Sequence, residues 1–439
     1  MKKKKLIFSN NKGDENLSSQ LIKEKEKDKN INEIDGDIPV DLNIPNNSEI
    51  LVIGEDQNWA THGIHKYPAK YIPEFPRWAI KKFSKKGELI IDPFSGSGTT
   101  NIEAMLQGRK SYSLDVDPLA ILLTKVKTTP LNLKKLNESS EKLLNNIKET
   151  KTPKRVPNFK NRDHWFKKEV TQKLSIIKES IEKEENEDIK DFFKVNLSAI
   201  VRVCSNADLG SHKPCVRKGI NRRIPEPIDK FEKTLKENIK GMKEFVENLP
   251  EKYHPSGLIS KDALDIKLEN NSVKLAVTSP PYINALDYAR THKLEYYWLE
   301  FFKGSLVELK KDFVGTEQVY AKQYKEFHTL EIEELDSLME KIYNKDPKRA
   351  YIVYKYYIDM EQNLKEIYRV LEDGGKYVIF IGNNQIRGYT VENYKFIKDI
   401  AKKVGFKLYN YFKSGIINHY IPFDRAEKID KDHVLVLEK

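Results

Sequence analysis

The sequence has little cysteine and no long apolar run, and each shortage excludes a class of protein. Two cysteines, Cys204 and Cys215, are too few for a disulfide framework or a four-cysteine zinc site. No stretch of about 18 consecutive apolar residues occurs, which excludes a membrane-spanning helix. No apolar segment follows the basic first residues, so we expect no secretory signal. We therefore expect a cytoplasmic protein with no membrane partner and no metal site.

Basic residues outnumber acidic ones, 77 to 66, giving a formal net charge of +11. The lysine-rich N-terminus does not cause this, because residues 1–50 hold nine Lys and ten acidic residues. The excess is densest between Arg202 and Arg223, where Asp208 is the single acid. Such a stretch fits a nucleic acid, whose phosphates release counterions on binding, but a lysine-rich composition alone explains it equally well. The candidate nucleic-acid-binding residues are Arg202, Lys213, Arg217, Lys218, Arg222 and Arg223.

An α/β pattern runs through the chain and is interrupted by helices. A strand over 89–91, a helix over 99–107 and a strand over 111–114 form a βαβ unit, which implies parallel pairing. Amphipathic helices are then predicted over 132–149, 166–182 and 228–249. The strand pattern returns over 274–278 and 377–381, and 406–412 and 434–437 are predicted to close the sheet as an antiparallel pair.

These patterns predict an α/β fold with a mostly parallel sheet, an antiparallel edge hairpin and a largely helical insertion. We expect a flexible N-terminal extension over 1–48, because that segment is polar and lacks apolar periodicity. The sheet domain is expected to comprise 49–125 and 255–439, and the insertion 126–254. A second insertion, 303–350, is expected to contact DNA or a partner.

A glycine-rich turn, Asp92–Thr100, lies between a predicted strand and helix. Glycines allow a sharp turn and a close approach to a ligand, and ligands of open α/β sheets bind at the carboxyl ends of the strands. No Gly-Lys-Ser/Thr follows, and the spacing is not that of a dinucleotide site. Asp115 ends the next strand, where a carboxylate accepts two ribose hydroxyls, whereas Asp117 precedes Pro118 and suits a helix N-cap. A purely structural turn is the alternative.

A second motif, Ser279-Pro280-Pro281-Tyr282, directly follows an apolar strand. Two prolines make the turn rigid. The Ser279 hydroxyl and the Pro280 carbonyl can then accept hydrogen bonds from a planar amine, while the Tyr282 ring stacks on the base. Asp287–His292 follow closely and are candidates to line the same pocket, although an ordinary helix start explains them too.

Together the two motifs resemble those of the amino-methylating DNA methyltransferases that use S-adenosylmethionine, which have a Rossmann-like sheet. Asp92–Thr99 is similar to the cofactor motif, and Ser279–Tyr282 to the catalytic motif in the form typical of cytosine-N4 enzymes. The segment 61–73 is similar to the one that packs against the methionine part of the cofactor, and Asp262 falls where a residue near the adenine ring often lies.

The resemblance implies the following cofactor-binding residues: His65, Tyr67, Pro68, Lys70, Asp92, Pro93, Phe94, Ser95, Gly96, Gly98, Thr99, Thr100, Asp115 and Asp262. It implies these catalytic residues: Ser279, Pro280, Pro281 and Tyr282. The motif order resembles that of enzymes whose target-recognition region lies between the two motifs, here 126–254. The expected activity is N4-methylation of cytosine in duplex DNA within restriction-modification, with a cognate endonuclease as a further partner. Alternatives are adenine-N6 methylation, RNA methylation and a silent DNA-binding subunit.

Overall fold

The computed structural model describes residues 32–211, 213–217, 222–283, 287–301, 306–416 and 431–439. Lys218 of the basic stretch lies outside these ranges, as does most of the N-terminal segment. Within them, no helix is both long and apolar enough to cross a membrane.

The described strands form a nine-stranded sheet in the order β1-β2-β10-β11-β7-β6-β3-β4-β5 and a small β8-β9 pair. The bounds are β1 (Asn32–Asp35), β2 (Ser48–Ile53), β3 (Leu89–Asp92), β4 (Lys110–Leu114), β5 (Gly257–Ser260), β6 (Val273–Thr278), β7 (Leu371–Gly382), β8 (Asn384–Ile386), β9 (Tyr389–Val391), β10 (Lys407–Gly415) and β11 (Lys431–Glu438). Neighbouring strands of the large sheet are parallel except where β11 pairs with β7 and β10. The mostly parallel α/β fold is therefore confirmed.

The antiparallel pair β10–β11 differs from the prediction in its position. It is not at the edge of the sheet, because β10 also pairs with β2, and β2 pairs with β1. The strands β1 (residues 32–35) and β2 (residues 48–53) thus extend the sheet. β1 lies within the segment 1–48 that was expected to be a flexible extension, and β2 begins at the last residue of that segment. The apolar run Ile50–Val52 explains this, since it is buried against the sheet's helical cover.

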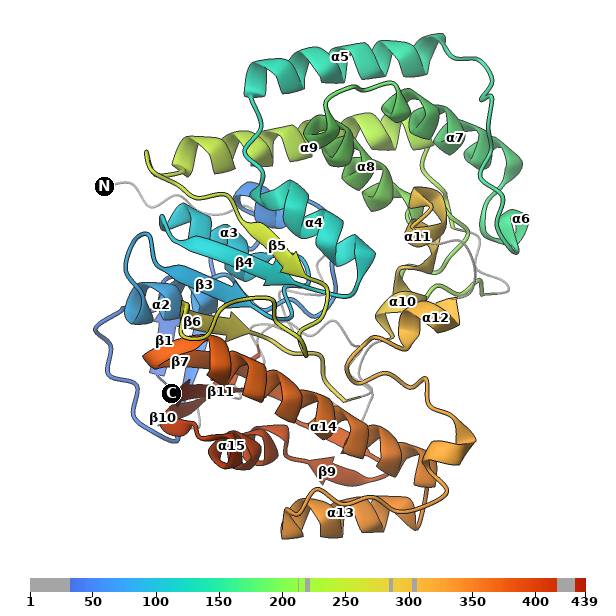
Figure 1. Ribbon diagram of the computed structural model, residues 1–439. Coiled ribbons are helices and arrows are strands. Elements are labelled where there is room, and N and C mark those ends of the chain that lie inside the picture. Colours follow the sequence, from blue (N-terminus) through green and yellow to red (C-terminus); the bar gives the residue numbers. More distant parts are fainter. Residues whose placement is uncertain (1–31, 212, 218–221, 284–286, 302–305, 417–430) are drawn as a thin grey trace.

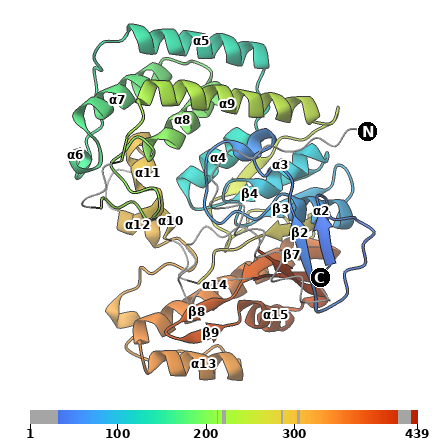
Figure 2. The same ribbon diagram turned by 180° about the vertical axis from the view of Figure 1, so that it is seen from behind.

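Helices cover both faces of the sheet (Figures 1 and 2). Successive strand residues point to opposite faces, so Ile90 packs with α2 (Glu74–Phe83) and α3 (Thr99–Leu106), while Ile91 packs with α14 (Pro347–Val370) and α15 (Asn393–Val404). Burial on both faces explains why these strands read as continuous apolar runs.

The segment 126–254 is helical, as predicted, and continues from α4 (Pro118–Thr128). The helices beyond α4 are α5 (Leu133–Glu149), α6 (Arg162–Trp165), α7 (Lys168–Glu182), α8 (Glu187–Val201) and α9 (Pro227–Asn248). After Ser279–Tyr282 the chain forms two short helices, α10 (Tyr288–Thr291) and α11 (Lys293–Leu299). The remaining described elements are η1 (Ala60–Gly63), α12 (Leu306–Lys310), η2 (Ala321–Gln323) and α13 (Glu333–Tyr343).

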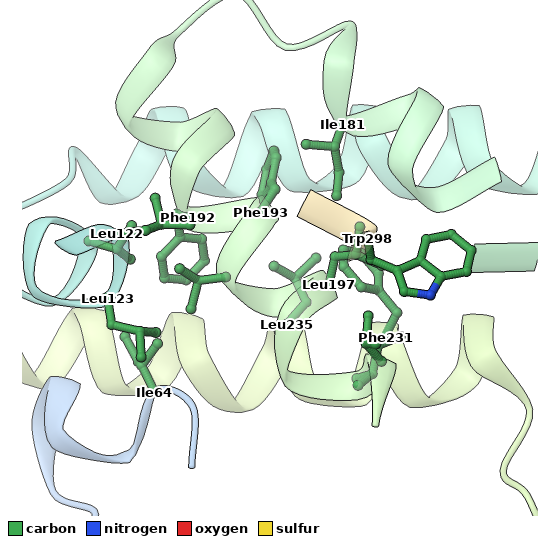
Figure 3. Packing of buried hydrophobic residues seen from close by; sticks show 14 of the residues in the cluster. Ile64, Leu122, Leu123, Ile181, Phe192, Phe193, Leu197, Phe231, Leu235 and Trp298 are labelled. Carbon is green, nitrogen blue, oxygen red and sulfur yellow. The ribbon is translucent and has the colours of Figure 1, made fainter. Parts of the chain in front are cut away.

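One hydrophobic core joins these helices to the sheet domain (Figure 3). Phe192 and Phe193 of α8 and Phe231 of α9 belong to the same buried cluster as Leu123 of α4 and Ile64 of the segment before α2. Trp298 of α11 completes it. The helical insertion therefore shares its core with the domain that carries the glycine turn.

Candidate active site

The two sequence motifs meet at the carboxyl ends of adjacent strands. β3 lies between β4 and β6. Asp92 ends β3, Asp115 follows β4, and Ser279 follows β6. From β3 the chain runs outward to β4 and β5, and it then crosses back to β6 on the other side. The site therefore lies where the strand order reverses, which is where open α/β sheets bind ligands.

A cavity opens at this point, and many of the predicted residues line it. These are Tyr67, Lys70, Pro93, Phe94, Ser95, Gly96, Thr99, Asp115, Asp262, Ser279 and Pro281. Other predicted residues are not part of its lining: His65, Pro68, Asp92, Gly98, Thr100, Pro280 and Tyr282. Ala69, Tyr71 and Ser97 also line the cavity and belong to the two motif segments 61–73 and 92–100, although they were not singled out as binding residues. The lining residues outside every motif are Val116, Lys261, Ala263, Asp312, Phe313 and Val314.

Asp92 holds the turn together from beneath the cavity. Its buried carboxylate accepts hydrogen bonds from the Phe94 amide and from the hydroxyls of Thr100 and Thr278. Burial raises its pKa to about 6, although these three donors favour the charged form. Asp92 thus ties β3, the start of α3 and the end of β6 together, immediately before Ser279.

Asp115 presents its carboxylate to the cavity. Oδ2 accepts the Gly96 amide at 2.8 Å and Oδ1 accepts the Asp117 amide at 2.9 Å. Each oxygen keeps a second lone pair for another donor. Burial, reinforced by the nearby Asp117 carboxylate, raises the pKa of Asp115 to about 7. Asp117 caps α4, as predicted, by accepting the Leu119 amide at 2.8 Å.

Two glycines shape the turn. Gly96 and Gly98 have φ angles of 50° and 82°, the left-handed region that favours glycine. A Cβ on Gly98 would lie 3.0–3.2 Å from Thr124 of α4, and one on Gly96 would lie 3.3 Å from the Tyr67 ring. The turn therefore needs glycine both for its backbone conformation and for its close packing.

The segment before α2 forms one wall of the cavity through Tyr67 and Lys70. The Tyr67 hydroxyl donates to Asp117 at 3.1 Å, and the Lys70 ammonium donates to the carbonyl of His62 at 3.2 Å. His65 points elsewhere, because its Nε2 lies 3.0 Å from the Ser198 hydroxyl of α8. Burial lowers the pKa of His65 to about 4, so this imidazole is neutral and links the wall to the helical insertion.

The turn Ser279–Tyr282, called here the catalytic-type turn, has some residues that line the cavity and others that contact the core. Ser279 and Pro281 face the cavity, and the described residues provide no hydrogen-bond partner for the Ser279 hydroxyl. The Tyr282 hydroxyl donates to Asp432 of β11 at 2.9 Å. Burial raises the pKa of Asp432 to about 6. The motifs did not reveal Asp432, since 150 residues separate it from Tyr282 in the chain.

An aromatic stack closes the cavity on the side of the second insertion. Tyr288, from the candidate segment Asp287–His292, stacks on Tyr67 at 5.8 Å between ring centroids and on Phe313 at 6.5 Å. Asp312, Phe313 and Val314 belong to the second insertion, 303–350, whose sequence carries no motif that marks them. The one sequence feature that could have predicted this wall is Tyr288, because it follows the Ser279–Tyr282 motif closely.

The basic stretch is largely engaged within the protein. Arg202 donates to the carbonyls of Asp208 and Ser211, and Arg222 donates to those of Val203 and Ser205. Arg202 and Arg222 therefore hold the loop in shape, and their contact with a nucleic acid stays a prediction.

The other basic residues of the stretch are held less firmly. Arg217 pairs with Asp208 at 2.9 Å but stays mostly exposed. Arg223 is exposed, and Lys213 borders a groove beside the cavity. These three cations stay candidates for contact with a polyanion.

Comparisons with known proteins indicate the class of the protein. Residues 1–126 match the family model described as DNA methylase. The chain is similar to the type II methyltransferase M.MvaI of Kocuria varians, with 27% identity over 403 residues that span 84% of this chain and 87% of the relative. It is also similar to the type II methyltransferase M.MjaII of Methanocaldococcus jannaschii, with 28% identity over 43% of this chain and 38% of the relative.

Among solved structures, the chain matches a SAM-dependent methyltransferase from Methanosarcina mazei with 9% identity and a TM-score of 0.30, covering 85% of this chain and 98% of that one. At that score the likeness does not bear on function. The family model and the sequence relatives together support a DNA methyltransferase.

Proposed function

We propose that the protein transfers a methyl group from S-adenosylmethionine to the exocyclic N4 amine of cytosine in duplex DNA, as the modification enzyme of a restriction-modification system. The observation that carries the proposal is the shared cavity of Ser279 with Asp115 and the glycine turn. A methyl acceptor held at Ser279 thereby lies next to a ligand held at Asp115. The substrate DNA places this activity in the cytoplasm, where a cognate endonuclease is the expected partner.

The residues around the cavity fit S-adenosylmethionine in their donors and acceptors. Asp115 has acceptor capacity for two ribose hydroxyls, and Asp262 lines the same cavity. Lys70 brings a positive charge suited to a carboxylate, and burial lowers its pKa, so an anionic ligand would stabilise its charged form. When bound, S-adenosylmethionine supplies a methyl group activated by a sulfonium.

Ser279 and the Pro280 carbonyl are proposed to orient the target amine. Its lone pair is conjugated with the ring and is poorly nucleophilic. Hydrogen bonds from the two amine hydrogens to these oxygens favour a pyramidal nitrogen aimed at the methyl group. The nitrogen gains a methyl group and releases one proton to solvent. Ser279 is too weak a base to remove that proton before the attack, so its role is orientation.

The target base must leave the DNA stack to reach Ser279. Tyr288 and Phe313, which border the cavity, are candidates to stack on it. The Tyr282 ring, which the motif resemblance also proposes for stacking, packs against the core and lies outside the cavity lining. Arg217, Lys213 and Arg223 are candidates for DNA contact, because no backbone carbonyl of the described residues is bonded to their side chains.

The proposal predicts incorporation of labelled methyl groups from S-adenosylmethionine into duplex DNA, with N4-methylcytosine found by mass spectrometry of the digested product. Ser279→Ala should lower kcat on the order of 100-fold, the scale of losing one orienting polar group, with cofactor affinity retained. The matched control is Ser272→Ala, at the opposite end of β6, where the hydroxyl only donates to the Glu269 carbonyl.

Three results would count against this function. N6-methyladenine in the product would reassign the target base. A label found only in RNA would reassign the substrate. Equal turnover of Ser279→Ala and Ser272→Ala would remove Ser279 from the mechanism.

A further inference from the structure

A groove adjoins the catalytic cavity and shares part of its wall. Tyr288, Phe313 and Val314 line both. Gly315, also in the groove, lies against the catalytic-type turn, because a Cβ placed on it would be 3.2 Å from the Tyr282 carbonyl oxygen. The groove therefore continues directly from the place where the methyl acceptor is proposed to bind.

Four cationic side chains from distant parts of the chain border this groove. Lys213 comes from the loop between α8 and α9, Arg290 from α10, Lys310 from α12 and Lys348 from the first turn of α14. Figure 1 shows α10 and α12 lying between the helical insertion and the end of α14. The sequence shows no cluster at these positions, so only the fold brings the charges together.

The acids of the groove neutralise only part of this charge. Asp287 is bonded to Lys310, and Glu317 pairs with Arg349 at 3.1 Å. In the described ranges of the chain, no carboxylate pairs with Lys213, Arg290 or Lys348. Arg290 and Lys348 are also exposed. Unlike Arg202 and Arg222, whose guanidinium groups are bound to backbone carbonyls, these three cations are available to a ligand in solution.

We propose that this groove holds the phosphates of the DNA strand that carries the target base, with Lys213, Arg290 and Lys348 as the contacting residues. The inference rests on the proposed function. A base that enters the cavity remains attached to its strand, so the flanking phosphates must pass the cavity mouth. Three cations without a carboxylate partner there attract phosphates and release their counterions. The charge of the groove favours this occupant over an apolar protein surface.

The test compares two triple variants with equal loss of charge. The groove variant carries Lys213→Gln, Arg290→Gln and Lys348→Gln. The control carries Lys134→Gln, Lys135→Gln and Lys142→Gln, exposed residues of α5 on the outer side of the helical insertion (Figure 1). Binding of a labelled mixed-sequence duplex is measured by fluorescence anisotropy between about 50 and 200 mM KCl. Binding of S-adenosylhomocysteine, the reaction product, verifies that each variant retains its fold.

In the groove variant, log affinity should fall less steeply with log salt concentration than in the wild type. The magnitude of the slope should decrease by about 1 for each cation removed, roughly 3 in all. The control should change the slope by less than about 1 in total. If wild-type protein binds duplex with a steep slope and both variants keep it, the groove is not the phosphate path, while the proposed function stands. Absence of salt-dependent duplex binding by the wild type would instead overturn the proposed function.

Discussion

At the residue scale, Asp115 should make cofactor affinity depend on pH. Its pKa of about 7 means that it is mostly ionised at pH 8 and mostly protonated at pH 6. Protonation costs one acceptor, so S-adenosylhomocysteine should bind more weakly as the pH falls through 7, by up to about tenfold per pH unit. Isothermal titration calorimetry of the wild type and Asp115→Asn from pH 6 to 8.5 measures this. The Asn variant should bind weakly with a flatter profile; parallel profiles would exclude Asp115 as the titrating group.

The chemistry of the turns around Asp115 was predictable, while the distant partners of their side chains were not. The assignment of Asp117 as a helix cap rested on its position before Pro118, and the structure confirms it. The placement of Asp92 below the cavity depends on Thr278, which is 186 residues away in sequence. Local rules describe a turn well because its φ angles and first hydrogen bonds involve near neighbours.

At the scale of elements, the contact between the catalytic-type turn and β11 should matter for turnover. Asp432→Ala leaves the partly buried Tyr282 hydroxyl without its acceptor, which should cost about 1–3 kcal/mol of stability and lower kcat. Asp432→Asn keeps an acceptor oxygen and should retain most activity. The double variant Tyr282→Phe, Asp432→Ala should recover stability relative to Asp432→Ala, because no unsatisfied donor remains. Unfolding by denaturant and steady-state kinetics measure both.

A dissociation constant for S-adenosylhomocysteine serves as the control, since Asp432 is not among the residues lining the cavity. It should be unchanged in all three variants. If the free-energy changes of the single variants Tyr282→Phe and Asp432→Ala add up to that of the double variant, the Tyr282–Asp432 hydrogen bond is not the interaction at work.

The amphipathic helices themselves were predicted well from the sequence. The helices expected over 132–149, 166–182 and 228–249 correspond to α5, α7 and α9. α8 was missed, although Asn186 caps it and its apolar residues recur at helical spacing. β5, which precedes Asp262, was also missed, because a short strand carries little periodic signal.

At the scale of the whole molecule, the helical insertion and the sheet domain share one core. The sequence separates them at residue 126, yet Leu123, Phe193 and Ile64 lie in the same buried cluster. His65 adds a polar link to Ser198 of α8. Loss of packing in the helices should therefore reach the wall of the cofactor cavity.

Phe193→Ala should lower the free energy of unfolding by about 3–5 kcal/mol, the usual cost of a large core cavity. Circular dichroism measures the loss of helix, and a binding assay measures the loss of S-adenosylhomocysteine binding. Both should occur at the same denaturant concentration, because one core joins both parts. Tyr253→Ala, at an exposed aromatic residue, is the control and should change little. Cofactor binding that survives after the helices have unfolded would show two independent units.

The βαβ unit, the glycine turn and the residues on either side of it follow from the sequence, because strand periodicity and left-handed glycines are local properties. Which cations lack a carboxylate partner, and where these cations meet, depends instead on long-range packing. Arg202 and Arg222 look available in the sequence but are bound by backbone carbonyls, while Lys213, Arg290 and Lys348 meet from distant parts of the chain. Charge patterns are therefore interpreted correctly only after long-range packing has assigned each group its partner.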